Sequence, residues 1–302
     1  MKAVICPKSG PPEVLQIAEV TRPVPQPDEI LVKVHCATVT RGDVLLRRIP
    51  RLVLAVVGTL FGFKAMKIPG VEYSGEVEEI GSRVTLFEKG DTVSGSTTGL
   101  RYGANAEYVC VPEKPKHGVI SGKPDGITFK QAAAAIVGAM TALQFLKRAE
   151  IETGDSVLIY GASGSVGSYA VQLAKHLGAE VTGVCSTSNV DLVRSIGADR
   201  VVDYTKEDFT RNGQRYDVIF DAVGKLSKSR CSGSLATRGR YITVKTPTRE
   251  KAAELEYVQK LVGSGKIKVL IDREYPLEQI VEAHRYVESG RKKGNVVIHV
   301  SG

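Results

Sequence analysis

The sequence predicts an α/β protein in which a mostly antiparallel β region is followed by a doubly wound parallel sheet. Three observations predict this architecture. Short strand-like runs separated by turn residues fill the first third of the 302 residues. Strand-like and helical runs then alternate, as they do in parallel sheets. Finally, a glycine-rich turn joins one of those strands to a helix, within residues 160–167 (YGASGSVG).

The first third is divided by glycine and proline, for example at Gly10-Pro11-Pro12 and from Pro23 to Pro27. Between these breaks we expect an irregular antiparallel barrel or sandwich. The expected strands are Lys2–Cys6, Val14–Val20, Glu29–Ala37, Tyr73–Ile80, Asp91–Ser94 and Ala106–Val111.

The pattern changes at Asp125, where an alanine-rich helical stretch runs to Arg148. The strands expected after it are Val157–Tyr160, Val181–Val184, Val201–Val202, Val218–Phe220 and Tyr241–Val244. The tail should contain helices near Thr248–Val262 and Leu277–Glu288 and strands near Lys268–Ile271 and Asn295–Val300. Thr246 and Pro247 are a suitable N-cap and first-turn pair for the first of these helices.

Composition narrows the class of protein. The net charge of +8 comes from basic residues spread along the chain, with no long basic run and no interleaved aromatic residues. We interpret it as a solvated surface rather than a surface for nucleic acid. The five cysteines are scattered and form no C-x-x-C pair, which predicts reduced thiols in a cytoplasmic protein. The apolar run from Met1 to Cys6 is too short for a signal peptide.

One apolar segment, Leu52–Phe63, is flanked by arginine and lysine. It is shorter than the roughly 18 residues needed to span a bilayer, so we expect no stable membrane insertion. A flap beside an apolar substrate pocket and a core helix are the favoured readings, and a membrane-surface anchor is the third.

The glycine-rich turn is the strongest functional signal. Glycines let the backbone turn tightly and approach phosphates, and the N-terminus of the following helix offers unpaired N–H groups and a positive dipole end. We therefore predict a dinucleotide pyrophosphate cradle and redox chemistry. Ala162 stands where the usual first glycine would be. The predicted cradle comprises Gly161, Ala162, Ser163, Gly164, Ser165, Val166 and Gly167.

Six segments in order resemble the medium-chain dehydrogenase/reductase superfamily, in its zinc-lacking quinone oxidoreductase-like branch. They are 2–15 (KAVICPKSGPPEVL), 70–75 (GVEYSG), 103–109 (GANAEYV), 160–175 (YGASGSVGSYAVQLAK), 221–224 (DAVG) and 293–297 (KGNVV). The resemblance covers nearly the whole chain. It implies a GroES-like catalytic domain over 1–122 and 268–302, a Rossmann domain over 123–267, and a cleft between them for the nicotinamide.

Zinc-dependent members of this superfamily place a cysteine ligand where this chain has Thr40. They place a histidine at Val71, just before the glutamate at Glu72. A catalytic zinc needs three protein ligands, and here a hydroxyl and an alkyl group replace two of them. We therefore expect no metal, and Glu72 can be read as a hydrogen-bonded structural carboxylate.

The expected cofactor is NADPH, with NADH as the alternative. NAD specificity usually rests on a carboxylate about 20 residues after the glycine turn, whereas residues 185–188 (CSTS) contain no acid. Ser186, Thr187 and Ser188 have hydroxyls that could donate to a 2′-phosphate, and Tyr204 stands where similar enzymes bind that group. Many relatives carry lysine or arginine at the position of Ser188.

The resemblance also implies contacts on the nicotinamide side of the cofactor. Thr141 resembles a threonine that lines the nicotinamide amide, and residues after the fourth and fifth strands border the riboses. The alternative role for each is as a turn or packing residue. The implied contact residues are Thr141, Ala222, Val223, Gly224, Val244 and Asn295.

The expected reaction is hydride transfer to a small hydrophobic carbonyl or quinone substrate. Thr40 would donate a hydrogen bond to the carbonyl, and Asp43 would orient a water or the ribose; a helix cap is the other reading of Asp43. Several relatives carry a tyrosine where this chain has Leu45, so we expect protonation by solvent. The alternatives are an NAD(P)-dependent alcohol dehydrogenase and a non-catalytic NADPH-binding protein.

One departure from the family follows Val244. Relatives usually continue with a helix and another strand at the sheet edge, where they form a dimer. This chain runs almost directly into the Thr248–Val262 helix. We expect a shortened sheet with an exposed edge, which puts the usual homodimer in doubt.

Overall fold

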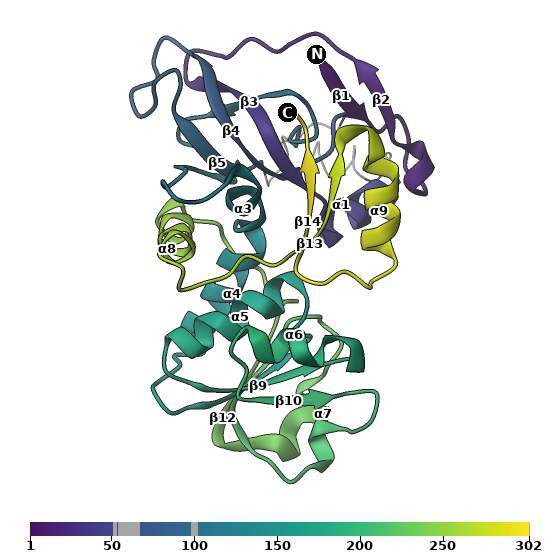
Figure 1. Ribbon diagram of the computed structural model, residues 1–302, viewed down its shortest axis with the longest axis vertical. Helices are drawn as coiled ribbons and strands as arrows, with labels where there is room; N and C mark the ends of the chain where they lie inside the picture. The colour runs from purple at the N-terminus through teal and green to yellow at the C-terminus, as the bar shows by residue number, and fades with distance from the viewer. Residues whose placement is uncertain (51–52, 54–66, 98–101, 302) are drawn as a thin grey trace. The chain divides into compact units, whose positions relative to one another are not determined.

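The computed structural model describes residues 1–50, 53, 67–97 and 102–301 (Figure 1). The chain divides into two compact units. Unit 1 comprises Met1–Val137, Glu250–Gly263 and Ile271–Gly302, and unit 2 comprises Gly138–Arg249 and Ser264–Leu270.

Unit 1 is built on a mostly antiparallel sheet, as predicted. Its seven strands follow the order β13-β14-β3-β4-β5-β7, with β6 paired to β3, and only the β13–β14 pair is parallel. The bounds are β3 (Glu29–Thr38), β4 (Glu72–Ile80), β5 (Thr92–Ser96), β6 (Tyr108–Pro112), β7 (Val119–Gly122), β13 (Ile271–Pro276) and β14 (Asn295–His299). A separate hairpin pairs β1 (Lys2–Ile5) with β2 (Gln16–Glu19).

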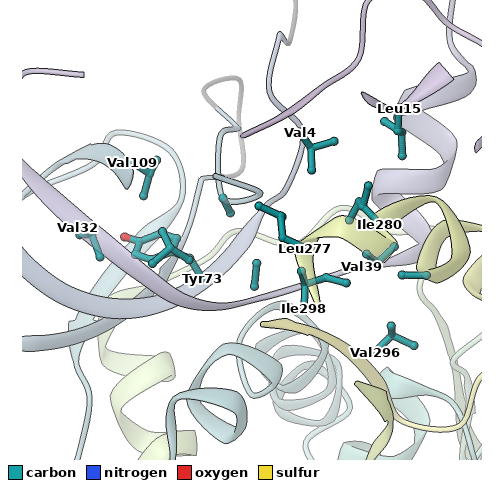
Figure 2. Close-up of a cluster of buried hydrophobic side chains, with 14 of the residues drawn as sticks. Val4, Leu15, Val32, Val39, Tyr73, Val109, Leu277, Ile280, Val296 and Ile298 are labelled. Atoms are coloured by element: carbon teal, nitrogen blue, oxygen red, sulfur yellow. The ribbon is translucent and has the colours of Figure 1, made fainter. Parts of the chain in front are cut away.

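In the described part of unit 1 the helices are α1 (Arg41–Arg48), α3 (Phe129–Ala134), α8 (Ala252–Gly263) and α9 (Ile280–Glu288). α3 packs on β3 and β4, and α9 packs against α1. Figure 2 shows the cluster of buried side chains that holds these elements together. It includes Val4, Leu15, Val32, Tyr73, Leu277 and Ile298.

Unit 2 contains the predicted parallel sheet, in the order β10-β9-β8-β11-β12. The strands are β8 (Ser156–Tyr160), β9 (Glu180–Cys185), β10 (Arg200–Asp203), β11 (Tyr216–Asp221) and β12 (Leu235–Thr243). The helices are α4 (Val137–Arg148, in this unit from Gly138), α5 (Ser165–His176), α6 (Val190–Ser195) and α7 (Lys228–Cys231). The strand order reverses direction at β8, and ligands bind at the carboxyl ends of strands beside such a switch point.

Several elements differ from the prediction. The expected helix over Asp125–Arg148 is two helices. Thr128 and Gln131 form a capping box that starts α3, and the Glu72 carboxylate accepts the Val137 N–H at 2.6 Å where α4 starts. The strand β7 was missed.

The tail also departs from the expected bounds. Thr246 and Pro247 are not a cap: α8 begins at Ala252, and the Thr246 N–H closes a turn with the Thr243 carbonyl. The strand expected at Lys268–Ile271 lies instead at Ile271–Pro276. The amide side chain of Gln172 binds both the N–H and the carbonyl of Lys268, at 2.7 and 3.0 Å, in place of a strand neighbour.

The shortened sheet is present. Residues 244–251, all described, contain no helix or strand, and β12 is hydrogen-bonded to one strand, β11. β12 is therefore an edge strand. Among the residues described, no helix is long and apolar enough to cross a bilayer. Apart from Val53, the apolar segment Leu52–Phe63 lies outside the described residues.

Candidate nucleotide and active site

The glycine-rich turn has the geometry that only glycine permits. Gly161 follows β8 with a φ of 82°, and a Cβ there would lie 2.2 Å from Cγ2 of Val223. A Cβ on Gly167 would lie 2.1 Å from the carbonyl oxygen of Gly161. Gly164 is the N-cap of α5. The first turn of that helix, Ser165 to Gly167, presents N–H groups that have no intrahelical acceptor, so the turn fits a pyrophosphate.

Ala162 has a packing role in this turn. It is fully buried, and its N–H and that of Gly161 both donate to the carbonyl of Val184, at 3.0 Å. These bonds fix the turn against β9.

Thr141 lies on α4, one helical turn after Gly138. A Cβ added to Gly138 would come 2.3 Å from Oγ of Ser165. The structure thus places the α4 face that carries Thr141 beside the start of α5.

Asp221, at the end of β11, organises the second predicted cofactor segment. Its buried carboxylate accepts the N–H groups of Val223, Gly224 and Leu226 at 3.1, 2.8 and 2.8 Å. The Ala222 N–H donates to the Tyr160 carbonyl, and that of Val244 donates to the Asp221 carbonyl. The structure therefore brings residues 222–224 and Val244 to the same sheet edge as the glycine turn. Sequence reasoning gave Asp221 no role.

The hydroxyls predicted to receive a 2′-phosphate follow β9, and a carboxylate lies next to them. β10 ends at Asp203, whose Oδ2 accepts a hydrogen bond from Thr187 Oγ1 at 2.5 Å. This bond lowers the pKa of Asp203. Thr187 is therefore engaged with Asp203, whereas Ser186 and Ser188 lie 3.4 Å apart, oxygen to oxygen. The side chain of Tyr204 is exposed.

Thr40 and Asp43, the predicted catalytic pair, form the capping box of α1. Asp43 Oδ2 accepts from the Thr40 N–H at 2.8 Å and from Thr40 Oγ1 at 2.5 Å, and the Asp43 N–H donates to Thr40 Oγ1 at 3.2 Å. Asp43 is buried, and this burial raises its pKa. The helix-cap reading of Asp43 is thus correct for this structure.

Asn295, the last predicted cofactor residue, is buried at the start of β14 in unit 1. The Val39 N–H donates to the carbonyl of Val296 at 3.1 Å, which places Asn295 beside the segment leading to Thr40. Tyr102 was missed by sequence reasoning. Its φ is 48°. Burial raises the pKa of the Tyr102 hydroxyl, and the charge of Asp43 raises it further.

The residues at the family's zinc positions do not fit a zinc ion. Thr40 and Val71 offer no ligand of the usual kind, and the carboxylate of buried Glu72 is bound by Thr38 Oγ1 and the Val137 N–H. In the described part of the chain, no three His, Cys, Asp or Glu side chains are grouped to hold a metal. Burial raises the pKa of Glu72 to about 7. Burial lowers the pKa of Lys292 to about 8, and the Nζ of this lysine donates to the Gly294 carbonyl.

A glycine-turn cradle on a parallel sheet, joined in one chain to a mostly antiparallel unit that contains buried acids, defines a dinucleotide-binding oxidoreductase. Comparison with known families agrees. A family model described as the alcohol dehydrogenase GroES-like domain matches residues 26–121, and one described as a zinc-binding dehydrogenase matches residues 165–272.

Individual relatives extend this match over the full chain. 2-Methylene-furan-3-one reductase of Solanum lycopersicum is 32% identical over 99% of this chain and 79% of its own length. The chloroplastic NADPH-dependent alkenal/one oxidoreductase of Arabidopsis thaliana is 30% identical over the same shares. The solved quinone oxidoreductase from Coxiella burnetii has a TM-score of 0.86 and 30% identity, covering 100% of this chain and 99% of that one. The chain belongs to the medium-chain dehydrogenase/reductase superfamily, in its quinone oxidoreductase-like branch.

Proposed function

We propose that this protein is a zinc-independent reductase that transfers a hydride from NADPH to quinones or α,β-unsaturated carbonyl compounds. The observation that carries the proposal is the set of residues at the zinc positions: Thr40 and Val71 are not zinc ligands of the usual kind, and the Glu72 carboxylate is hydrogen-bonded by Thr38 and Val137. Without a metal to activate it, an alcohol loses hydride with difficulty, whereas an electron-poor double bond accepts hydride readily. The names of the relatives support the same substrate class.

In this proposal, different segments hold different parts of the cofactor. Residues 161–167 hold the pyrophosphate, and residues 222–224, with Val244, border the riboses. The bound cofactor supplies the hydride. Thr141, and Asn295 in unit 1, are proposed contacts of the nicotinamide end.

The proposed preference for NADPH rests on Ser186, Ser188 and Tyr204, whose hydroxyls can donate to a 2′-phosphate. The Asp203 carboxylate contacts this segment, and it accepts hydrogen bonds from the hydroxyl of Thr187, from the hydroxyl of Thr205 at 2.7 Å and from the Thr205 N–H at 3.0 Å. These three bonds occupy most of the roughly four acceptor positions of the carboxylate, which leaves too few for both ribose hydroxyls of NADH. A relative described as NADPH-dependent supports the assignment.

Thr40 is the proposed hydrogen-bond donor to the substrate oxygen that gains negative charge, and Asp43 positions it. The Thr40 hydroxyl donates to Asp43 in this structure, so its proton becomes available to a substrate when Asp43 is itself protonated. The raised pKa of buried Asp43 favours that state. Leu45 has no proton to give, and solvent is the proposed proton source.

The test is oxidation of NADPH and NADH, followed by loss of absorbance, with and without a chelator. The acceptors are 1,4-benzoquinone, 9,10-phenanthrenequinone, 2-hexenal, methyl vinyl ketone and crotonyl-CoA. Chelator-insensitive oxidation of NADPH with any of them is the expected result, and the responding acceptors identify the substrate class. Activity that the chelator abolishes would contradict zinc independence.

The family model described as a zinc-binding dehydrogenase favours a second candidate, an NAD(P)-dependent alcohol dehydrogenase. Reduction of NADP⁺ by alcohols, without turnover of the acceptors above, would select it. NADPH binding without any turnover would select a non-catalytic role. A cytoplasmic location is part of the proposal, supported by the five cysteines, all of them free thiols.

A further inference from the structure

We propose that Asn189 is a positioning residue that directs two serine hydroxyls toward the phosphates of the cofactor and so favours NADPH over NADH. The proposal rests on the proposed function. Asn189 ends the short 3₁₀ turn Thr187–Asn189 after β9 and is the N-cap of α6. Sequence reasoning stopped one residue before it.

The amide of Asn189 joins two segments predicted to hold different phosphates. Nδ2 donates to Oγ of Ser163 in the glycine turn at 3.0 Å and to Oγ of Ser186 after β9 at 3.2 Å. The Asn189 N–H also donates to the Ser186 carbonyl at 2.9 Å. Both protons of the side-chain amide are therefore used on serine oxygens.

These bonds set the polarity of both hydroxyls. A hydroxyl that accepts a hydrogen bond keeps its own proton for a different acceptor. Ser186 Oγ lies 3.4 Å from Ser188 Oγ. The Ser186 hydroxyl can therefore donate its proton either to a ligand directly or to Ser188. In the second case, the Ser188 hydroxyl donates its own proton to the ligand. Phosphate oxygens only accept, and hydrogen bonds to charged groups are the strong ones. Asn189 thus prepares both serines as donors.

The buried environment favours this orientation of the amide. Oδ1 of Asn189 is buried and has no hydrogen-bond partner among the described residues. Turning the amide over would bring Oδ1 to the serines and leave the two N–H groups buried without acceptors. Two unpaired donors cost more than one unpaired acceptor.

Thr187 gives a contrast within the same segment. Its Oγ1 donates to Asp203 at 2.5 Å and lies 2.9 Å from Oγ1 of Thr205. The proton of Thr187 is therefore committed to a carboxylate that stays charged because its pKa is lowered. Of the three hydroxyls after β9, the two serines are oriented for a phosphate and the threonine is not.

The test is calorimetric titration of NADPH and NADH into the full chain and its variants. Asn189→Ala should weaken NADPH binding about tenfold and NADH binding only about threefold, because the effect on Ser163 is common to both cofactors. Asn189→Asp has the same shape but only accepts, so it should turn both hydroxyls inward and weaken NADPH binding about 100-fold. Asn212→Ala, which removes an asparagine whose Oδ1 accepts the Gln214 N–H outside this segment, is the control and should leave the ratio of the two affinities unchanged.

A double-mutant cycle separates positioning from general loosening. If Asn189 acts through Ser186, Asn189→Ala should not change the NADPH-to-NADH ratio further in a Ser186→Ala protein. Thermal unfolding without nucleotide checks that each variant folds. If an Asn189 variant does not fold, Ser186→Ala tests the same chain of hydrogen bonds. An unchanged ratio in Asn189→Ala, or normal NADPH binding by Asn189→Asp, would overturn the inference alone. Failure of the unaltered protein to bind either nucleotide would overturn the proposed function, and the inference with it.

Discussion

Val223 lies directly against Gly161, so that a Cβ on Gly161 would come 2.2 Å from Cγ2 of Val223. The two residues follow neighbouring strands, β8 and β11, which are paired from Val157 and Val218 to Tyr160 and Asp221. Their contact holds the glycine turn and the 222–224 turn together at the edge of the sheet where we place the cofactor. Space at this contact, rather than backbone freedom alone, requires glycine at position 161.

Gly161→Ala should therefore lower stability and abolish cofactor binding. Gly213 provides the control, because it has a similar φ of 76° but open space around it. Gly213→Ala should lose only the roughly 1–2 kcal/mol that a left-handed backbone costs an alanine. Gly161→Ala should lose a further 1–3 kcal/mol or so from overpacking. Denaturant unfolding and NADPH titration measure both effects, and equal losses in the two variants would contradict the role of Val223.

Glu72 should make the protein less stable as the pH rises. Its pKa is raised from 4.5 to about 7 by burial, so between these values the folded state holds the proton and the unfolded state has lost it. Its contribution is thus fully present below pH 4.5 and is lost as the pH rises through about 7, by on the order of 3 kcal/mol.

Glu72→Gln should remove this pH dependence. The variant should therefore become more stable relative to the unaltered protein as the pH rises. Denaturant unfolding across this pH range measures the difference in unfolding free energy between the variant and the unaltered protein. The contributions of other titrating groups cancel in this difference. Glu76→Gln, at an exposed position of the same strand, is the control and should follow the unaltered protein. Stability curves for Glu72→Gln that run parallel to those of the unaltered protein would show that Glu72 does not titrate in this way.

Thr40→Ala separates catalysis from helix capping. Thr40 and Thr128 both form capping boxes in unit 1, on α1 and α3. Each alanine variant should lose about 1 kcal/mol of stability. Only Thr40→Ala should also lower kcat/KM, by about 100-fold, since removal of one donor to a developing oxyanion has that size of effect. Thr40→Ser keeps the hydroxyl and should retain activity. Equal kinetics for the two alanine variants would assign Thr40 to capping alone.

The protein should be a monomer in solution. β12 is one of the two edge strands of unit 2, and it carries exposed Thr237 and Arg238 and half-buried Arg240. Arginines along an edge oppose pairing with a second copy of the same strand. Light scattering after size-exclusion chromatography measures the mass, and a stable dimer would show that an interface survives.

Local patterns predicted the parts of the molecule that depend on neighbouring residues. The glycine turn could be predicted because the backbone geometry of residues 161–167 itself requires small residues. Asn189 could not, because its partner Ser163 lies 26 residues earlier and meets it only after β8 and β9 have paired. Asp203 was missed for the same reason, since it reaches Thr187 from the neighbouring strand. The strand expected at Lys268 was wrong because Gln172, 96 residues away, binds its backbone.

Transfer of deuterium from NADPH labelled at C4 of the nicotinamide tests the central proposal most directly. The protein is incubated with either C4 epimer of the labelled cofactor, 2-hexenal and a chelator, and the product is analysed by mass spectrometry. We expect hexanal that carries one deuterium at the β-carbon from one epimer only. Oxidation of NADPH without deuterium in the product, or no oxidation of a cofactor that the protein binds, would contradict hydride transfer by this chain.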